Sequence, residues 1–135
     1  KLVDVLLEWR ASPRRLTRTD ARYAPARFFA RKHQALLAGP LRARGPVVIW
    51  GAGEIGKAWS RALRESGVPV RAFVEVDPRK LGQRIHEVPV VEPAAAVAMG
   101  EPLHLAAVGQ RGARERIRAF AHARGLPDER LVALA

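Results

Sequence analysis

The sequence contains no cysteine among its 135 residues and only one tyrosine and one methionine. Without cysteine, disulfide bonds and thiolate metal sites are excluded. No apolar run approaches the roughly 20 residues of a transmembrane helix, and the opening KLVDVLLEWR carries charges and no small-residue cleavage site, unlike a signal peptide. These absences favour a cytoplasmic protein. Because the chain begins at Lys1 rather than at methionine, we expect a fragment of a longer protein.

Negative charge is scarce, since 24 Lys and Arg residues stand against 13 Asp and Glu, for a net charge of +11. Residues 1–46 carry 11 basic and 3 acidic side chains, whereas residues 47–135 carry 13 and 10. Such a basic surface suits nucleic acid, anionic membranes or phosphorylated ligands, or is simply solvated. The chain has no helix-turn-helix, zinc-finger or ribonucleoprotein motif, so we do not expect a nucleic-acid partner.

The stretch TRTDARYAPARFFARKHQALLAG predicts a helix before the first Gly-Pro pair. Thr19 or Asp20 can cap its start, and Pro25 is tolerated in a first helical turn. Its apolar stripe needs a partner surface, and we expect it to dock on the rest of the chain rather than on a second copy. The stripe and the positions beside it comprise Phe28, Phe29, Lys32, Leu36 and Leu37.

From residue 47 onward, apolar strands alternate with helical stretches, which is typical of a parallel α/β sheet with right-handed crossovers. We predict a Rossmann-like α/β/α domain of three layers, with a five-stranded parallel sheet in the order 3-2-1-4-5. A helical segment and linker, residues 1–45, precede this domain, residues 46–135. The strands are expected at 47–50, 68–76, 88–91, 103–109 and 131–134, and the helices at 55–66, 92–99 and 113–125.

The glycine loop WGAGEIG, residues 50–56, is the main functional motif. It follows a buried strand and opens a helix, which is the setting of a loop that holds a dinucleotide pyrophosphate. Gly51 permits a tight turn, Gly53 lets a phosphate approach the backbone, and Gly56 lets the helix pack close to the strand. The helix N-terminus adds free N–H groups and partial positive charge. The alternative is that these glycines serve packing alone and no ligand binds.

A carboxylate lies about 20 residues beyond the loop, as ribose recognition requires. Glu75 is the first candidate and Asp77 the second, whereas Glu54 places an unfavourable charge within the loop itself. Arg79 and Lys80 follow and either accept a 2′-phosphate or form a solvated turn. The residues expected to bind the ligand are Gly51, Ala52, Gly53, Glu54, Ile55, Gly56, Glu75, Asp77, Arg79, Gly109 and Arg111.

The last two of these belong to a second glycine turn, VGQRG, residues 108–112. In a parallel sheet this turn lies beside the first one, so Gln110, Arg111 and Arg114 are placed to meet the same ligand, unless the turn is a plain connection. No Ser-His-Asp arrangement, Tyr/Lys pair at helical spacing or metal-ligating histidine cluster is present. The sequence therefore predicts no catalytic centre and no metal site.

Two parts of the chain resemble bacterial family 2 glycosyltransferases. Residues 6–25, LLEWRASPRRLTRTDARYAP, resemble the segment that follows their catalytic domain. The glycine loop, together with DPRKLG and VGQRG, resembles the Rossmann-like carboxyl-terminal domain that is fused to some of them. The glycine loop with DPRKLG is also similar to the nucleotide-sugar-binding domain of sugar acyltransferases, and to CoA-binding and sugar-dehydratase units. Where family 2 enzymes often carry a metal-assisting histidine, this chain has Ser12.

The resemblance implies an accessory module that binds NAD(P) or a nucleotide sugar. Its main partner would be an amino-terminal glycosyltransferase domain, which holds the metal motif and the donor site in that family. Two alternatives stay open. One is a small NAD(P)-dependent or sugar-nucleotide-modifying enzyme unit. The other is an interaction domain that binds no small molecule and holds its parent protein in a homodimer.

Overall fold

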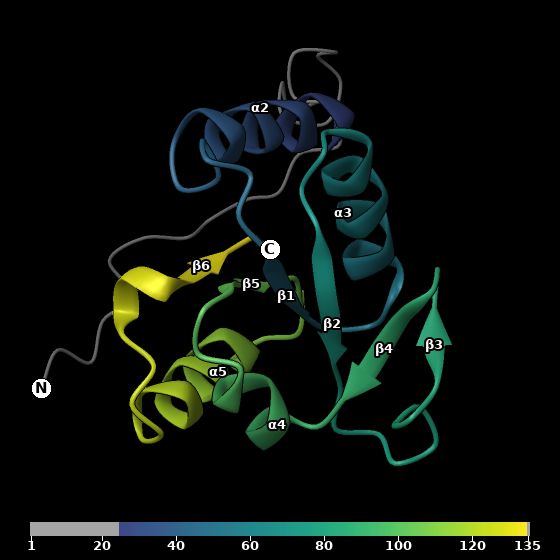
Figure 1. Cartoon of the computed structure of the whole chain (residues 1–135), viewed down its shortest axis with the longest axis vertical. Helices are drawn as coiled ribbons and strands as arrows, with labels where there is room; N and C mark the ends of the chain where they lie inside the picture. Colours follow the sequence, from purple (N-terminus) through teal and green to yellow (C-terminus); the bar gives the residue numbers. More distant parts are fainter. Residues whose placement is uncertain (1–24, 135) are drawn as a thin grey trace, which may run out of the picture.

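The computed structural model of the chain describes residues 25–134 (Figure 1). The expected helix cap at Thr19 or Asp20 and nearly all of the motif at residues 6–25 lie outside this range. The elements are α2 (Pro25–Ala38), β1 (Val47–Trp50), α3 (Glu54–Glu65), β2 (Val70–Val74), β3 (Arg84–Ile85), β4 (Val88–Val91), α4 (Pro93–Ala98), β5 (Leu103–Ala106), α5 (Ala113–His122), a 3₁₀ turn (Asp128–Arg130) and β6 (Leu131–Ala133).

The sheet differs from the expected five parallel strands, because it has six strands in the order β3-β4-β2-β1-β5-β6. Strands β4, β2, β1, β5 and β6 pair in parallel, whereas β3 pairs with β4 in antiparallel fashion at the sheet edge. The expectation of a wholly parallel, five-stranded sheet was therefore wrong. The mixed α/β class with a mainly parallel sheet is confirmed.

The added strand lies in the basic segment that sequence patterns assign to a loop. It is only two residues long, and its turn to β4 places His86 and Glu87 at φ of 50° and 65°. Such left-handed pairs in a two-residue hairpin turn normally contain Asn or Gly. With neither residue present, the sequence carries no hairpin signal at this point.

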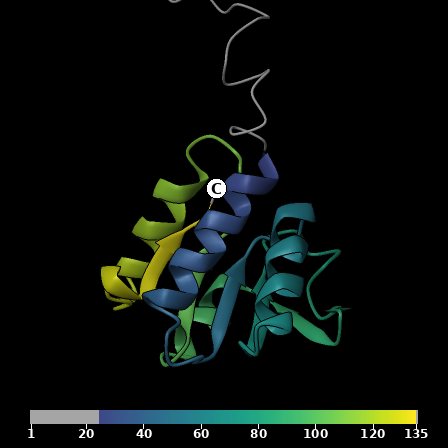
Figure 2. The same cartoon turned by 90° about the horizontal axis from the view of Figure 1, so that it is seen from above.

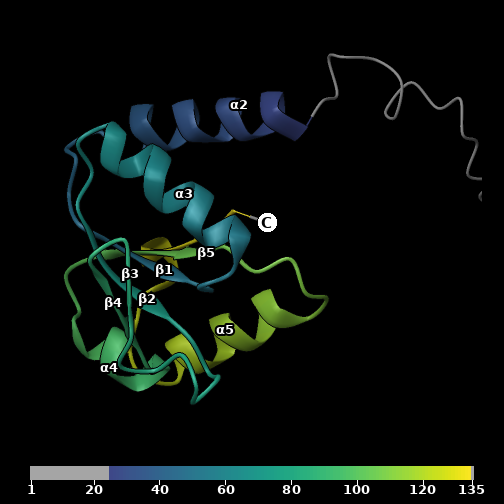
Figure 3. The same ribbon diagram turned by 90° about the vertical axis from the view of Figure 1, so that its right-hand side faces the viewer.

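Helices cover both faces of the sheet, giving three layers (Figure 3). Helices α2 and α3 lie on one face, and α4 and α5 lie on the other. Strand β1 is buried along its whole length. Its alternate side chains serve two cores, so Val47 and Ile49 pack toward α3, whereas Val48 and Trp50 pack toward α4 and α5. A continuous apolar strand is what burial on two faces requires.

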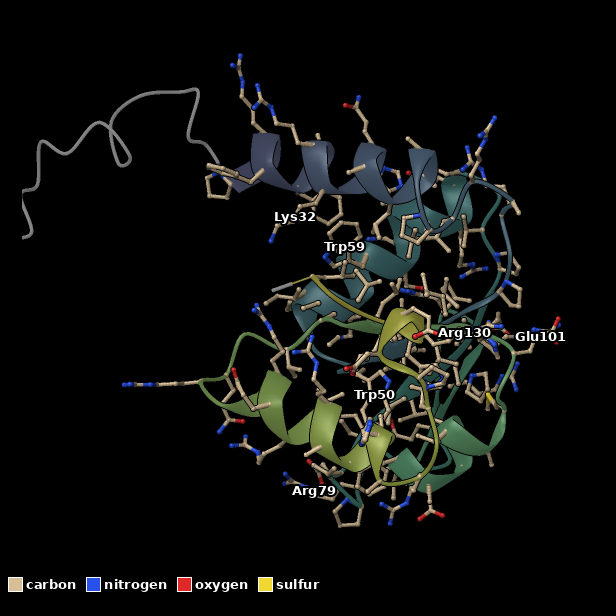
Figure 4. All side chains as sticks on the ribbon, turned by 90° about the vertical axis from the view of Figure 1, so that its left-hand side faces the viewer. Lys32, Trp50, Trp59, Arg79, Glu101 and Arg130 are labelled. Atoms are coloured by element: carbon tan, nitrogen blue, oxygen red, sulfur yellow. The ribbon has the colours of Figure 1, made fainter. Side chains whose placement is uncertain are left out.

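Helix α2 docks on the domain, as expected (Figure 2). The Phe29 and Trp59 ring centroids are 4.3 Å apart, and Leu36 is 5% exposed. Trp59 lies between α2 and the sheet (Figure 4). The Lys32 Nζ donates a hydrogen bond to the Leu134 carbonyl at 2.8 Å, which ties α2 to the chain after β6. Phe28, expected in the buried stripe, is instead 49% exposed.

The structure offers no helix within residues 25–134 that is long and apolar enough to cross a lipid bilayer.

Candidate nucleotide-binding site

The glycine loop connects β1 to α3 and is shaped by two close backbone approaches. Gly51 has φ of 105°, a left-handed conformation that glycine adopts readily. A Cβ at Gly56 would lie 1.9 Å from the Gly51 carbonyl oxygen, so no larger residue fits there. Gly51 thus has the turn conformation, and Gly56 the close packing, that the sequence predicts for them.

Gly53 has a different environment, because a Cβ built on it would meet no atom within 4 Å. It is the N-cap of α3, and no side-chain cap satisfies the first N–H groups of this helix. Uncapped N–H groups at a helix N-terminus attract anions through hydrogen bonding and the helix dipole. The loop thus has open space over Gly53, where the backbone can approach a phosphate.

Glu75 follows β2 and lies directly beside the loop. Its Oε1 accepts a hydrogen bond from the Ala52 N–H at 3.2 Å and forms an ion pair with Lys80 Nζ at 2.9 Å. Its Oε2 accepts a hydrogen bond from the Val76 N–H at 3.2 Å. Burial opposes ionisation of Glu75, but these hydrogen bonds and the Lys80 charge hold its pKa below the usual value. The carboxylate is therefore ionised at neutral pH.

An apolar cavity of about 300 Å³ opens beside Glu75, on the α5 side of the sheet. We call it the nucleotide cavity. Its walls come from the ends of β1 and β2, the start of α4 and one face of α5, and Val76 at its edge is 78% exposed. Residues that define it include Trp50, Glu75, Val76, Pro93, Ile117 and Phe120. The size and the mostly apolar walls suit a flat heterocyclic base.

The second glycine turn lies against the first, as predicted. A Cβ at Gly51 would come within 3.1 Å of the Val108 side chain, and one at Gly109 within 3.4 Å of Ile55. Gln110 lines the nucleotide cavity. Arg111 is exposed and does not line it, so the structure gives this predicted residue no place in the cavity wall.

Asp77 and Arg79 pair with each other instead of lining the cavity. The Arg79 Nη2 and Asp77 Oδ2 are 2.9 Å apart, and the Arg79 side chain is 88% exposed. The hydrogen bonds from Arg79 lower the pKa of Asp77. Arg79 lies at the periphery of the molecule (Figure 4). Of the two candidate carboxylates, Glu75 is thus the one that the fold places beside the loop.

Glu54 is turned away from the nucleotide cavity. Its side chain is 86% exposed and pairs with Lys57 at 3.1 Å, which lowers its pKa. Both residues line a second hollow on the α3 side of the loop, of about 490 Å³, which we call the basic groove. The unfavourable charge that the sequence places within the loop is thereby neutralised by its own helix.

Behind the nucleotide cavity, the fully buried His104 supports Trp50. The Trp50 Nε1 donates a hydrogen bond to His104 Nδ1 at 3.0 Å. His104 Nε2 has no hydrogen-bond partner within residues 25–134. Burial, with a smaller effect of Arg130, lowers the pKa of His104 to about 4. The imidazole is therefore neutral, and its hydrogen bond to Trp50 holds one wall of the cavity in place.

Sequence patterns missed the α5 wall of the cavity. The residues Ala113, Arg116, Ile117 and Phe120 line it with the i, i+3, i+4, i+7 spacing of one helix face. That spacing is visible in the sequence, but it also describes a helix packed on a core. Only the position of α5 beneath the glycine loop assigns this face to the cavity.

Across the described range, no group of three His, Asp or Glu residues is arranged to hold a metal ion.

No protein-family model matches the chain, and no curated protein matches it. Solved structures of RSP, a Rex-family repressor, share its fold. One has a TM-score of 0.56 at 16% identity, covering 78% of this chain and 60% of that chain. The structure of RSP in complex with β-NADH has a TM-score of 0.55 at 16% identity, covering 78% of this chain and 61% of that chain. The structure of RSP with β-NAD+ and operator DNA has a TM-score of 0.54 at 16% identity, covering 77% of this chain and 57% of that chain.

This chain thus spans about three fifths of the length of those repressor chains. At such low identity the likeness concerns the fold, and the fold that it shows is a Rossmann-like α/β domain.

Proposed function

We propose that this chain is a binding module for a nicotinamide dinucleotide, NAD or NADH. The observation that carries the proposal is the nucleotide cavity, which lies between the glycine loop, Glu75 and α5. Ligands of open α/β sheets bind in the crevice beyond the carboxyl ends of the strands, where the strand order reverses. That reversal lies between β1 and β5, and the cavity is beside it, because Gly51 after β1 and Val108 and Gln110 after β5 line the cavity.

In this proposal the adenine ring fills the cavity, with Val76 and Ile117 on its apolar walls. The Glu75 Oε2 accepts a hydrogen bond from a ribose hydroxyl, because Val76 N–H is its only hydrogen-bond donor among residues 25–134 and a carboxylate oxygen has a further lone pair. The pyrophosphate lies over Gly53, at the uncapped N-terminus of α3. Each of the three ligand groups has a chemically matched surface.

The structural neighbour in complex with β-NADH supports the choice of a dinucleotide over a nucleotide sugar. The described residues that surround the cavity provide no acid-base pair or nucleophile aimed into it, since Glu75 is already ion-paired with Lys80. The geometry therefore supports binding rather than catalysis as the role of this unit.

Isothermal titration of the purified chain tests the proposal, with NADH, NAD+, UDP, a UDP-sugar and CoA as separate titrants. We expect saturable binding of NADH or NAD+. The variant Gly53→Val removes the space for the phosphate and should abolish that binding, because the wild-type glycine has free space at the Cβ position. The matched control is Gly45→Val, which also has free space at Cβ but lies before β1. If only a UDP-sugar bound, the dinucleotide proposal would be wrong and the ligand would be a nucleotide sugar.

We propose further that the module belongs to a longer glycosyltransferase. The support for this is the resemblance of residues 6–25 to the segment that follows a family 2 catalytic domain. Co-purification of the full-length gene product with a nucleotide-sugar-dependent transferase activity is the expected result. A full-length protein without a transferase domain would contradict it and would leave the binding proposal standing.

A further inference from the structure

The basic groove lies on the opposite side of the glycine loop from the nucleotide cavity. It is formed between α3 and the β3–β4 hairpin, and Ala52 of the loop is one of its residues. Its polar side chains come from both walls. They include Glu54, Lys57 and Arg61 on α3, and Lys80, Arg84 and His86 on the segment from β2 through the hairpin.

Two of its four cations are already neutralised. Lys57 pairs with Glu54 at 3.1 Å, and Lys80 pairs with Glu75 at 2.9 Å. Arg61 makes no hydrogen bond or ion pair with any described residue. Its charge helps to lower the pKa of Glu54, but that carboxylate is already paired with Lys57. Arg84 donates a hydrogen bond to the Glu87 carbonyl, a neutral acceptor. Two guanidinium groups thus face the groove without a carboxylate of their own.

A hydrogen bond from a side chain joins the two walls of the groove. Arg64 Nη1 donates a hydrogen bond to the His86 carbonyl at 2.7 Å, which fastens the hairpin to α3. The hairpin turn is strained, because His86 and Glu87 both have positive φ. Strained backbone of this kind persists where the surrounding structure enforces it, and it concentrates at functional sites. The spacing between the Arg61 and Arg84 walls is therefore set before any ligand arrives.

We propose that the basic groove is a second anion site, which binds a phosphate monoester between Arg61 and Arg84. A phosphate monoester carries nearly two negative charges at neutral pH, which matches the two uncompensated guanidinium groups. Guanidinium groups also bind phosphate oxygens in bidentate fashion, so two of them on opposite walls suit this ligand. The phosphate belongs either to the ribose of the bound dinucleotide or to a separate phosphorylated molecule.

With the first source, the bound nicotinamide dinucleotide is the phosphorylated form, NADP or NADPH, and this reading rests on the proposed dinucleotide site. Lys80 joins the two hollows, because it lines the basic groove and pairs with Glu75 of the nucleotide cavity. A ribose at Glu75 therefore lies one side chain away from the groove. The second source is independent of the dinucleotide, since the groove needs only a phosphate group of suitable charge.

The test begins with inorganic phosphate, titrated into the full-length chain at constant ionic strength and followed by amide chemical shifts in two-dimensional NMR. We expect saturable shifts at Arg61 and Arg84. The double variant Arg61→Gln/Arg84→Gln should weaken this binding at least tenfold. The control Arg31→Gln/Arg42→Gln removes the same charge from exposed positions on α2 and on the turn that follows α2, and should leave phosphate affinity unchanged. An equal loss of phosphate affinity in both double variants would mean that only the net charge matters and would overturn the site.

A second titration compares NADPH with NADH and so identifies the source of the phosphate. Tighter binding of NADPH, with the preference lost in Arg61→Gln/Arg84→Gln, assigns the phosphate to the dinucleotide. Equal binding of the two, with inorganic phosphate binding at the same time as NADH, assigns it to a separate molecule. If NADH binds but neither phosphate source contacts the groove, the anion site is overturned and the proposed function survives.

Discussion

The carboxylate of Glu75 accepts a hydrogen bond from the backbone N–H of Ala52, at 3.2 Å. This contact joins the end of β2 to the glycine loop at the end of β1, although the two residues are 23 positions apart. It fixes the carboxylate at the rim of the nucleotide cavity. The ion pair with Lys80 helps to lower the pKa of Glu75, so the carboxylate stays charged.

The first prediction concerns this carboxylate. Glu75→Gln keeps the shape and an acceptor for Ala52 N–H but removes the charge, so NADH affinity should fall about tenfold, as for a lost hydrogen bond to a charged group. Glu65→Gln is the control, since Glu65 is an exposed acid at the end of α3. Isothermal titration measures both. Equal affinity of Glu75→Gln and wild type would mean that the ribose lies elsewhere.

The second prediction separates two glycines of the same loop by stability. Gly56→Ala places a Cβ at 1.9 Å from the Gly51 carbonyl oxygen and should destabilise the fold by about 3 kcal/mol or more, because backbone must shift. Gly53→Ala meets no atom within 4 Å and should cost less than about 1 kcal/mol, the scale of losing a favourable N-cap residue. Urea unfolding measures both values, and comparable losses at the two positions would contradict the loop geometry.

The third prediction concerns pH and His104. Its pKa is about 4 in the folded protein and 6.5 as a free side chain, so the unfolded chain binds the proton more tightly. Stability from the neutral imidazole is complete above pH 6.5 and is lost as pH falls toward 4, by about 3 kcal/mol in total. His104→Asn, which retains an acceptor for Trp50, should unfold with a shallower pH dependence over this range. Denaturant melts at several pH values compare the two slopes, and parallel slopes would refute the assignment.

The fourth prediction concerns the docking of α2. Leu36→Ala removes a buried side chain and should destabilise the domain by roughly 2–4 kcal/mol. Phe29→Ala removes a partly buried ring that packs on Trp59 and should also destabilise the domain. Amide hydrogen exchange in α2 should accelerate in both variants. Gln34→Ala, at an exposed position of the same helix, is the control and should exchange like wild type. Fast exchange throughout α2 in the wild-type chain would show that the helix needs a further domain to dock.

Much of the site could be predicted from local sequence. The glycine spacing, the buried strand before it and the carboxylate beyond it all depend on short-range geometry, so they locate the loop and Glu75 without a structure. The choice between Arg79 and Lys80 could not be made in this way. That choice depends on the turn after β2, which directs Lys80 toward the Glu75 carboxylate, whereas Arg79 hydrogen-bonds to Asp77 at the exposed surface.

The sequence by itself determined the alternation of strands and helices and the two-sided burial of β1, because apolar periodicity reports which faces must leave water. Tertiary structure alone decided that β3 pairs with β4, since two residues carry no periodic signal and the His86–Glu87 turn lacks the usual glycine. It also decided that one face of α5 lines a cavity instead of a closed core. Both outcomes depend on contacts between segments distant in the chain, and local patterns do not encode which distant surfaces meet.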